Sequence, residues 1–297
     1  MEKSKAALLS VFSAILLTVL KFIVGIATNS LGIISEAIHS LIDLGAALLT
    51  LFAVKVSDVP ADDTHHYGHG KIESISAFVE VIMLLATCIY IINEAVLRLK
   101  GKPADIDVNI YAFGVMFISI IVDVTRSKAL YKTAKKTNSR ALEADALHFA
   151  SDIWSSLVVI VGLIGVKFLG FEQADAIAGL IVSIFVIVCS VRLSIKTINE
   201  LMDKAPKKLR NDIYRIIKSV PNVSSVQKLR IRTSGNTIFT DMALLVESSL
   251  SVEKAHDIAN NVEKNIKDAF PQADITLHLE PKGDSTKYHF KKRKDNI

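Results

Sequence analysis

Six long apolar runs dominate the first two-thirds of this sequence and constrain its fold more than any other feature. Each has about 20 residues or more, the length that a helix needs to cross the hydrocarbon core of a bilayer. The chain has 297 residues, is 51% hydrophobic and has a mean hydropathy of +0.39, above the usual values for soluble domains. The sequence therefore predicts an α-helical membrane protein with six transmembrane helices, at roughly residues 6–28, 31–57, 74–97, 109–127, 144–168 and 174–198.

Basic residues set the expected orientation of these helices. The largest cluster lies between the fourth and fifth runs, and the positive-inside rule places it in the cytoplasm. An even number of spans then puts both termini in the cytoplasm, although the smaller basic cluster at 98–102 would face outward. The first run is too long for a signal peptide, so we expect it to be retained. We therefore predict a multi-pass protein of the cell (inner or plasma) membrane, oriented by Arg126, Lys128, Lys132, Lys135, Lys136 and Arg140.

The sequence becomes polar after the sixth run, and Pro206 marks the change. Helical and strand-like segments then follow in the order αββαβ, which predicts a small α+β domain with one sheet covered by two helices. Ser251 can cap the second of these helices. The expected helices are 208–219 and 251–269, and the expected strands are 223–233, 237–247 and 274–279. The expected regions are a six-span domain at 1–204, a cytoplasmic domain at 205–282 and a basic disordered tail at 283–297.

A nine-residue pattern occurs twice inside the apolar runs, at 35–43 and at 144–152. Each copy reads acidic–Ala–aliphatic–His–x–x–x–Asp. Because positions i and i+4 share a face of a helix, His39 lies beside Asp43 and His148 beside Asp152. Charged side chains are costly within a membrane, and the two copies can meet at similar depth on antiparallel helices. The repeat therefore predicts one four-ligand site for a divalent cation rather than two self-contained hydrogen-bonded pairs.

The ligand types suggest both an ion and a mechanism. Two imidazole nitrogens and two carboxylate oxygens suit tetrahedral coordination, which Zn²⁺ prefers. Metal binding needs neutral imidazole and ionised carboxylate, so it displaces protons, and exchange of H⁺ for metal is the hypothesis that follows. Glu36 and Asp145 stand one turn before the two histidines. They either orient the ligands, form charged steps on the path of the ion or simply solvate helix ends.

A second group of ligands lies between the second and third runs. Asp62, His65 and His69 fall in a short segment where Gly68 and Gly70 allow tight curvature. The spacing Asp–x–x–His–x–x–x–His offers three ligands for a metal on the cytoplasmic side. A loop that is merely solvated is the alternative.

The C-terminal domain holds a third candidate group. His278 and Glu280 stand two residues apart on the last expected strand and therefore share a face of it. His256, on the preceding helix, could join them in a metal site. Surface decoration is the alternative.

These features together resemble the cation diffusion facilitator family, in its bacterial zinc- and iron-type divalent metal efflux transporters, over about residues 6–281. Segment 60–73 (PADDTHHYGHGKIE) resembles the family's loop between the second and third spans. The zinc-type members have His and Asp on both helices, whereas members for iron or a broader range often have another residue at the position of His39. The resemblance implies a transport site at His39, Asp43, His148 and Asp152 and a loop site at Asp62, His65 and His69.

The resemblance also implies a homodimer with a metallochaperone-like C-terminal domain. Some members hold two metals at the interface of that domain, and His256, His278 and Glu280 fall on matching positions. Gln227 and Ala243 stand where those members have histidine, and Glu280 replaces an aspartate, so one weaker site or none is expected.

A charge pair is a further implication of the resemblance. Lys71 and Asp203 match a pair that ties the two protomers together in similar proteins. We therefore expect the same interlock.

The leading interpretation is a secondary transporter, not an enzyme, that exports Zn²⁺ from the cytoplasm in exchange for protons. Zn²⁺ is its cargo and a candidate structural ion, and its other expected partners are protons, the lipid bilayer and a second copy of the chain, with no nucleic acid. The same fold could instead carry Fe²⁺, Co²⁺, Cd²⁺, Ni²⁺ or Mn²⁺, of which the ligand types disfavour Mn²⁺.

Two interpretations from other functional classes fit the sequence less well. An intramembrane zinc hydrolase would need a His–Glu–x–x–His motif, which the sequence lacks, and an open position for water. A metal sensor that does not transport would use only the soluble domain and would leave the histidines of the membrane unexplained.

Overall fold

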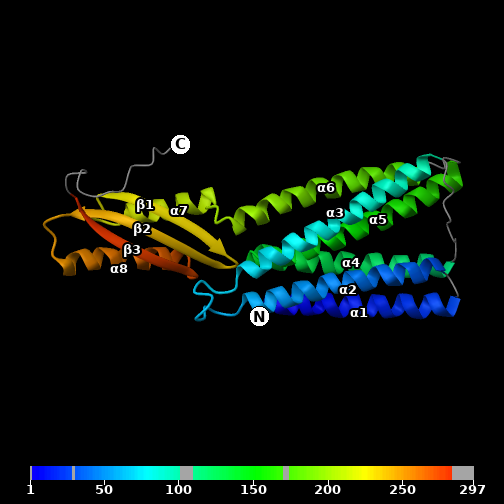
Figure 1. Cartoon of the computed structure of the whole chain (residues 1–297), viewed down its shortest axis with the longest axis horizontal. Coiled ribbons are helices and arrows are strands. Elements are labelled where there is room, and N and C mark those ends of the chain that lie inside the picture. Colours follow the sequence, from blue (N-terminus) through cyan, green and yellow to red (C-terminus); the bar gives the residue numbers. More distant parts are fainter. Residues whose placement is uncertain (1, 29–30, 101–109, 170–173, 283–297) are drawn as a thin grey trace. The chain divides into compact units, whose positions relative to one another are not determined.

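The computed structural model describes residues 2–28, 31–100, 110–169 and 174–282 (Figure 1). The chain divides into two compact units, Met1–Leu201 and Met202–Ile297. The predicted tail at 283–297 lies outside the described residues.

The described residues of the first unit form six long helices. Four of them contain segments long and apolar enough to cross a membrane: Glu2–Thr28, Ala37–Ser57, Lys71–Leu99 and Gly179–Leu201. Over their described residues, the fourth and fifth helices do not meet that criterion, so the exact number of spans stays a prediction. The helices are α1 (Glu2–Thr28), α2 (Leu31–Ser57), α3 (Lys71–Leu99), α4 (Ile110–Thr137), α5 (Arg140–Leu169) and α6 (Ala174–Leu201).

Helices α1 and α2 pack together, as do α3 and α6, and α5 packs with α3, α4 and α6 (Figure 1). Helix α4 also contacts α1, so it joins the two sides of the bundle. Helix α2 contacts α5, which brings the two copies of the repeated pattern together. Small residues let helix backbones approach closely in such a bundle. The buried alanines of one shared core are Ala7, Ala53, Ala134, Ala141 and Ala146.

Local features fix where these helices begin and how closely they pack. A Cβ on Gly25 of α1 would lie 2.9 Å from Ile34 Cγ1 of α2, so this close approach requires glycine. Between α4 and α5, Asn138 has φ 52° and ends the first helix. The hydroxyl of Ser139 then accepts a hydrogen bond from the N–H of Leu142 at 3.3 Å and caps α5. The start of α5 thereby sets the depth of the motif that it carries.

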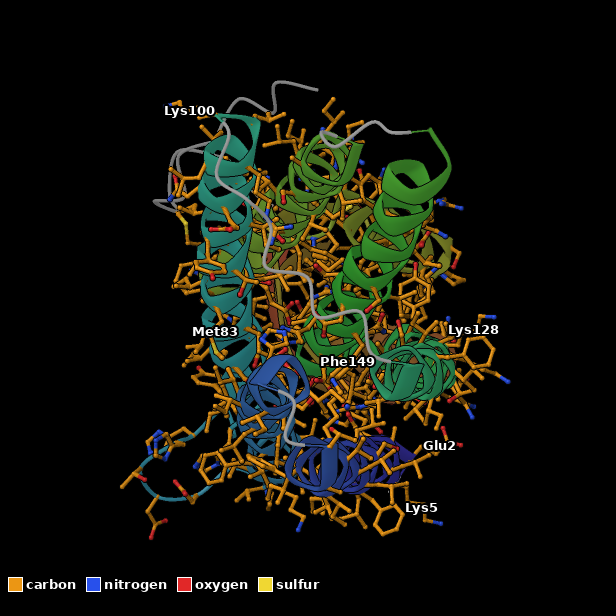
Figure 2. The ribbon with its side chains drawn as sticks, turned by 90° about the vertical axis from the view of Figure 1, so that its right-hand side faces the viewer. Glu2, Lys5, Met83, Lys100, Lys128 and Phe149 are labelled. Atoms are coloured by element: carbon orange, nitrogen blue, oxygen red, sulfur yellow. The ribbon has the colours of Figure 1, made fainter. Side chains whose placement is uncertain are left out.

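The basic residues that orient the helices lie on helices rather than in a loop, and one of them is buried. Because α4 continues to Thr137, Arg126 and the four lysines all belong to it, and Arg126 is buried within the bundle. The expectation that it marks the cytoplasmic surface is therefore wrong. In the view along the bundle, Phe149 lies in the interior and Lys128 projects outward (Figure 2). The exposed lysines Lys128, Lys132, Lys135 and Lys136 still support the orientation.

The second unit has the predicted αββαβ order and a mixed sheet. Strands β1 and β2 are antiparallel, and β2 and β3 are parallel, in the order β1-β2-β3. The predicted cap is confirmed, because Ser251 accepts a hydrogen bond from the N–H of Lys254. The core includes Ile213, Ile217, Leu244, Val262 and Ile266. The elements are α7 (Lys207–Ser219), β1 (Ser225–Ser234), β2 (Thr237–Glu247), α8 (Val252–Ala269) and β3 (Ala273–Lys282).

Candidate metal centres

The repeated pattern places three ligating side chains together between α2 and α5. His148 Nε2 lies 3.1 Å from Asp43 Oδ1 and 3.7 Å from Asp152 Oδ2. One ligand atom from each of the three residues falls within 4.8 Å of the others. The side chains of His148 and Asp43 are 7% and 13% exposed, and that of Asp152 is 23% exposed. An imidazole held between two carboxylates, one from each helix, forms a compact site with the charge to receive a divalent cation.

The fourth predicted ligand lies at the edge of this group. His39 Nε2 is 3.9 Å from Asp43 Oδ1, and its side chain is 44% exposed. His39 does not belong to the group of three, although its i, i+4 spacing keeps it beside Asp43. The structure thus gathers three of the four predicted ligands and places His39 next to them.

The two acidic residues one turn before the histidines differ in what can be described. Asp145 is fully buried, and its Oδ2 accepts a hydrogen bond of 2.9 Å from the Ser10 hydroxyl. Its Oδ1 has no hydrogen-bond partner in the described part of the chain. The side chain of Glu36 lies outside the described residues. Asp145 therefore does not solvate a helix end. The two remaining hypotheses are that it orients the metal ligands or that it forms a charged step on the path of the ion.

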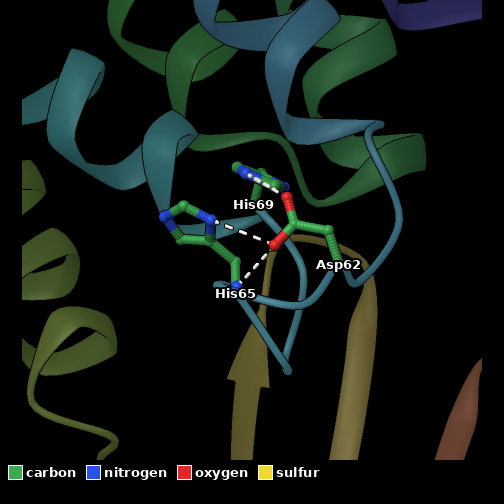
Figure 3. A group of neighbouring side chains, drawn as sticks. All are labelled: Asp62, His65 and His69. Carbon is green, nitrogen blue, oxygen red and sulfur yellow. Dashed lines mark hydrogen bonds and ion pairs between the residues drawn. The ribbon is translucent and has the colours of Figure 1, made fainter.

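The loop between α2 and α3 forms a second group of three (Figure 3). Asp62 Oδ1 lies 3.3 Å from His65 Nδ1, and Asp62 Oδ2 lies 3.6 Å from His69 Nε2. The imidazole rings of His65 and His69 are 4.3 Å apart between centres. Both rings thus flank one carboxylate, and the three side chains could hold a metal ion if the rings and the carboxylate turned slightly inward.

Backbone hydrogen bonds hold the Asp62 carboxylate in place. Its Oδ1 accepts the N–H of His65 at 2.6 Å, the N–H of Thr64 at 2.9 Å and the Thr64 hydroxyl at 2.9 Å. These bonds, first of all the one from the His65 backbone, hold the pKa of Asp62 well below its usual range. The carboxylate is therefore ionised, as a metal ligand must be.

Only one of the two loop glycines is required by the backbone. Gly68 has φ 71°, and its N–H donates to the His65 carbonyl at 2.9 Å. Gly70 instead has helical angles at the start of α3, so the curvature expected there is not observed. His66 turns away from the group, with its Nε2 3.0 Å from the Asp63 carbonyl.

Comparison with known families identifies the chain. Residues 7–202 match the cation efflux transmembrane domain, and residues 205–282 match the cytoplasmic domain of cation efflux proteins. The chain belongs to the cation diffusion facilitator family. The cation-efflux pump FieF of Shigella boydii serotype 18 is 31% identical over 279 residues, which cover 94% of this chain and 92% of the relative. FieF of Escherichia coli O1:K1 has the same identity and coverage.

Some solved structures are similar to about a quarter of the chain. The nickel form of a variant of the MamM C-terminal domain is 25% identical and covers 26% of this chain and 100% of its own, with a TM-score of 0.25.

Membership of the family establishes the general class of activity. The protein is a cation efflux transporter and a multi-pass protein of the inner membrane. Divalent metal cations are the substrates of cation diffusion facilitators, which are transporters rather than enzymes. The family fold, a helical membrane domain followed by an α+β cytoplasmic domain, is confirmed.

The predicted ligands of the cytoplasmic domain do not meet within one chain of this family member. His278 Nε2 is 4.0 Å from Glu280 Oε1, and the His278 side chain is 72% exposed. His256 is exposed on α8 and forms no three-ligand group with them among the described residues.

The residues of the expected interlock lie in different units. Lys71 Nζ, in the first unit, donates to the Leu201 carbonyl at 3.3 Å. Asp203 Oδ2, in the second, is 3.7 Å from Arg232 Nη1. The interlock between protomers stays a prediction.

Sequence reasoning missed the polar side chains that support buried charges of this transporter. Glu80 of α3 is fully buried and accepts hydrogen bonds from the hydroxyls of Thr50 and Ser76. Arg126 of α4 donates to the Ser10 hydroxyl at 2.7 Å. A charge inside an apolar run signals that it needs such partners. Hydroxyl groups are common in helices, so the sequence does not show which of them form hydrogen bonds with buried charges.

Proposed function

We propose that this transporter exports Zn²⁺ from the cytoplasm in exchange for protons, through a site formed by Asp43, His148 and Asp152 with His39 as the fourth ligand. The observation that carries the proposal is the position of His148, whose Nε2 lies 3.1 Å and 3.7 Å from carboxylates on two different helices. A small turn of His39 toward Asp43 would give two nitrogens and two oxygens around one ion. That set suits tetrahedral Zn²⁺.

Proton exchange follows from the chemistry of the same groups. A divalent cation needs the imidazoles neutral and the carboxylates ionised. When the ion leaves, two carboxylates from facing helices remain close together in a buried site, and like charges so placed favour the uptake of a proton. Protons taken up from the outer side would return to the cytoplasm as the next ion binds. The charge that moves outward is thus offset by charge that moves inward.

The proposal extends to topology, assembly and the loop. The exposed lysines at the end of α4 support a cytoplasmic location for this end of the bundle and for both termini. The match to the cytoplasmic domain of cation efflux proteins supports a homodimer. The group of Asp62, His65 and His69 would lie on the cytoplasmic side and hold a Zn²⁺ ion that is not transported.

Zinc uptake into proteoliposomes tests the transport site. We expect the wild-type protein to move Zn²⁺ and Asp152→Ala to lose the flux, with Asp241→Ala, a surface aspartate of the second unit paired with Arg230, as the matched control. Equal Zn²⁺ flux in the wild type and in Asp152→Ala would refute the site. A parallel panel of Fe²⁺, Co²⁺, Cd²⁺, Ni²⁺ and Mn²⁺ tests the choice of ion.

Antiport needs a separate measurement. An imposed pH gradient should drive Zn²⁺ uptake against its concentration gradient, and an ionophore that collapses the pH gradient should stop it. Flux that persists unchanged after the collapse would refute proton exchange while leaving the transport site intact.

A further inference from the structure

A buried chain of polar groups joins three helices beside the transport site. Arg126 of α4 is 5% exposed, and its Nε donates a hydrogen bond of 2.7 Å to the Ser10 hydroxyl of α1. That hydroxyl donates a bond of 2.9 Å to Asp145 Oδ2 of α5. The guanidinium also lies over the ring of Phe149, 3.4 Å from its centre, and Phe149 lies in the interior of the bundle (Figure 2). These contacts hold Arg126 in one place.

The two charges are joined through the hydroxyl rather than by direct contact. No ion pair within 4.0 Å joins Arg126 and Asp145, both of which are described. Asp145 Oδ1 and Arg126 Nη2 are both buried and have no hydrogen-bond partner among the described residues. A pair whose only task was to join helices would gain most from a direct, two-bonded contact. This arrangement instead leaves one carboxyl oxygen of Asp145 without a hydrogen-bond partner among the described residues.

Asp145 lies between the start of α5, at one end of the bundle, and the transport site. Asp145 precedes His148 by three residues, so it is about 4.5 Å nearer the start of α5. The proposed orientation puts that start in the cytoplasm. A cation that approaches from the cytoplasm along α5 would therefore reach the depth of Asp145 before that of His148 and Asp152.

We infer that Asp145 Oδ1 is the first buried ligand that a divalent cation meets on its way from the cytoplasm, and that Arg126 is a positioning residue that keeps this contact weak. The inference rests on the proposed function. A buried carboxylate without a counter-charge would hold a divalent cation tightly and delay its transfer. Arg126 supplies that counter-charge at a fixed distance through Ser10. Because a guanidinium does not lose its proton in proteins, the counter-charge is constant at every working pH.

Kinetics distinguish this role from a purely structural one. Removal of the guanidinium should strengthen the hold of Asp145 on the ion, so Arg126→Met should lower the apparent KM for Zn²⁺ by on the order of tenfold. It should also lower the maximal rate, because release from Asp145 becomes slow. A structural role predicts a lower maximal rate with an unchanged KM.

A second substitution tests the route through Asp145. Arg126→Met combined with Asp145→Asn removes both charges, and it should recover rate relative to Arg126→Met, with a KM no lower than that of the wild type. Arg126→Lys keeps the charge and should stay close to the wild-type KM. Ser10→Ala breaks the bridge without removing a charge and should lower KM by a smaller factor, so it provides a test if Arg126→Met does not fold.

The experiment is Zn²⁺ uptake by proteoliposomes over a range of concentrations, with Arg98→Met, at a partly exposed pair with Glu94, as the matched control. An unchanged or raised KM in Arg126→Met, or in Ser10→Ala where the first variant does not fold, would overturn the inference. A double variant no faster than Arg126→Met would also overturn it. Failure of the proposed function looks different, because wild type and Asp152→Ala would then show the same flux.

Discussion

The unequal positions of the two histidines predict unequal effects when each is removed. His148 is 7% exposed and lies between the carboxylates of Asp43 and Asp152, whereas His39 is 44% exposed and lies 3.9 Å from Asp43 alone. His148 is therefore in place before the ion arrives, and His39 must be ordered by it. We expect His148→Ala to weaken Zn²⁺ binding at the transport site more than His39→Ala does.

The expected difference can be worked out from these positions. Loss of a residue that merely supports a metal ligand lowers affinity by about 10- to 100-fold, so loss of a held ligand such as His148 should cost at least about 100-fold. That factor corresponds to about 2.8 kcal/mol. Ordering a mobile side chain offsets about 0.5–1.5 kcal/mol of the bond that it forms. His39→Ala should thus cost only about 10-fold.

Calorimetric titration of the purified protein with Zn²⁺ measures both affinities. A background with His65→Ala and His69→Ala removes the loop site, so that the transport site gives the main signal. His66→Ala is the matched control, because this neighbouring histidine turns toward the Asp63 carbonyl and away from the metal ligands. A loss in His39→Ala equal to or larger than that in His148→Ala would refute the reasoning from exposure and distance.

Three further predictions concern the loop and the ion pairs. Asp62→Asn keeps an oxygen for the backbone N–H groups but loses the charge, so it should abolish zinc binding by the loop. Its circular dichroism and protease resistance should stay as in the wild type. Asp62→Ala also loses the acceptor oxygen, so it should abolish zinc binding and increase proteolytic cleavage of the loop. Because hydrogen bonds, first of all the one from the His65 backbone, hold the pKa of Asp62 below its usual range, its carboxylate should stay ionised as the pH falls through about 4, and an NMR titration of its carboxyl carbon should show no protonation step there; a step near pH 4 would contradict this. Arg140→Gln removes the 2.6 Å hydrogen bond to the buried Glu200, at a cost of about 1–3 kcal/mol in the free energy of unfolding. It should therefore lower the midpoint of thermal unfolding by several degrees. Arg215→Gln, which removes an exposed ion pair with Asp212, should leave the midpoint unchanged.

The sequence predicted the helices and the proximity of each His to the Asp four residues later, because both depend on short-range spacing. Long apolar runs indicate helices whatever their neighbours are, and the interval from His148 to Asp152 places both on one helix face. The loop group was predictable for the same reason, since Asp62, His65 and His69 lie within eight residues. The position of His39 at the edge of its group was not predictable, because it depends on the rotation of α2 relative to α5.

The placement of Arg126 shows where this kind of reasoning stops. A hydropathy profile places a charge near the end of an apolar run in the loop that follows, and the prediction of membrane orientation from basic residues treats Arg126 in this way. The helix continues for eleven more residues, to Thr137, and three facts about the fold keep the charge inside it. Helix α1 brings the Ser10 hydroxyl within 2.7 Å, α5 places the ring of Phe149 under the guanidinium, and Asp145 lies one hydrogen bond beyond Ser10. None of these partners is near Arg126 in sequence, so the same residue that looks like a marker of orientation is, in the folded chain, a positive charge held in the interior of the bundle.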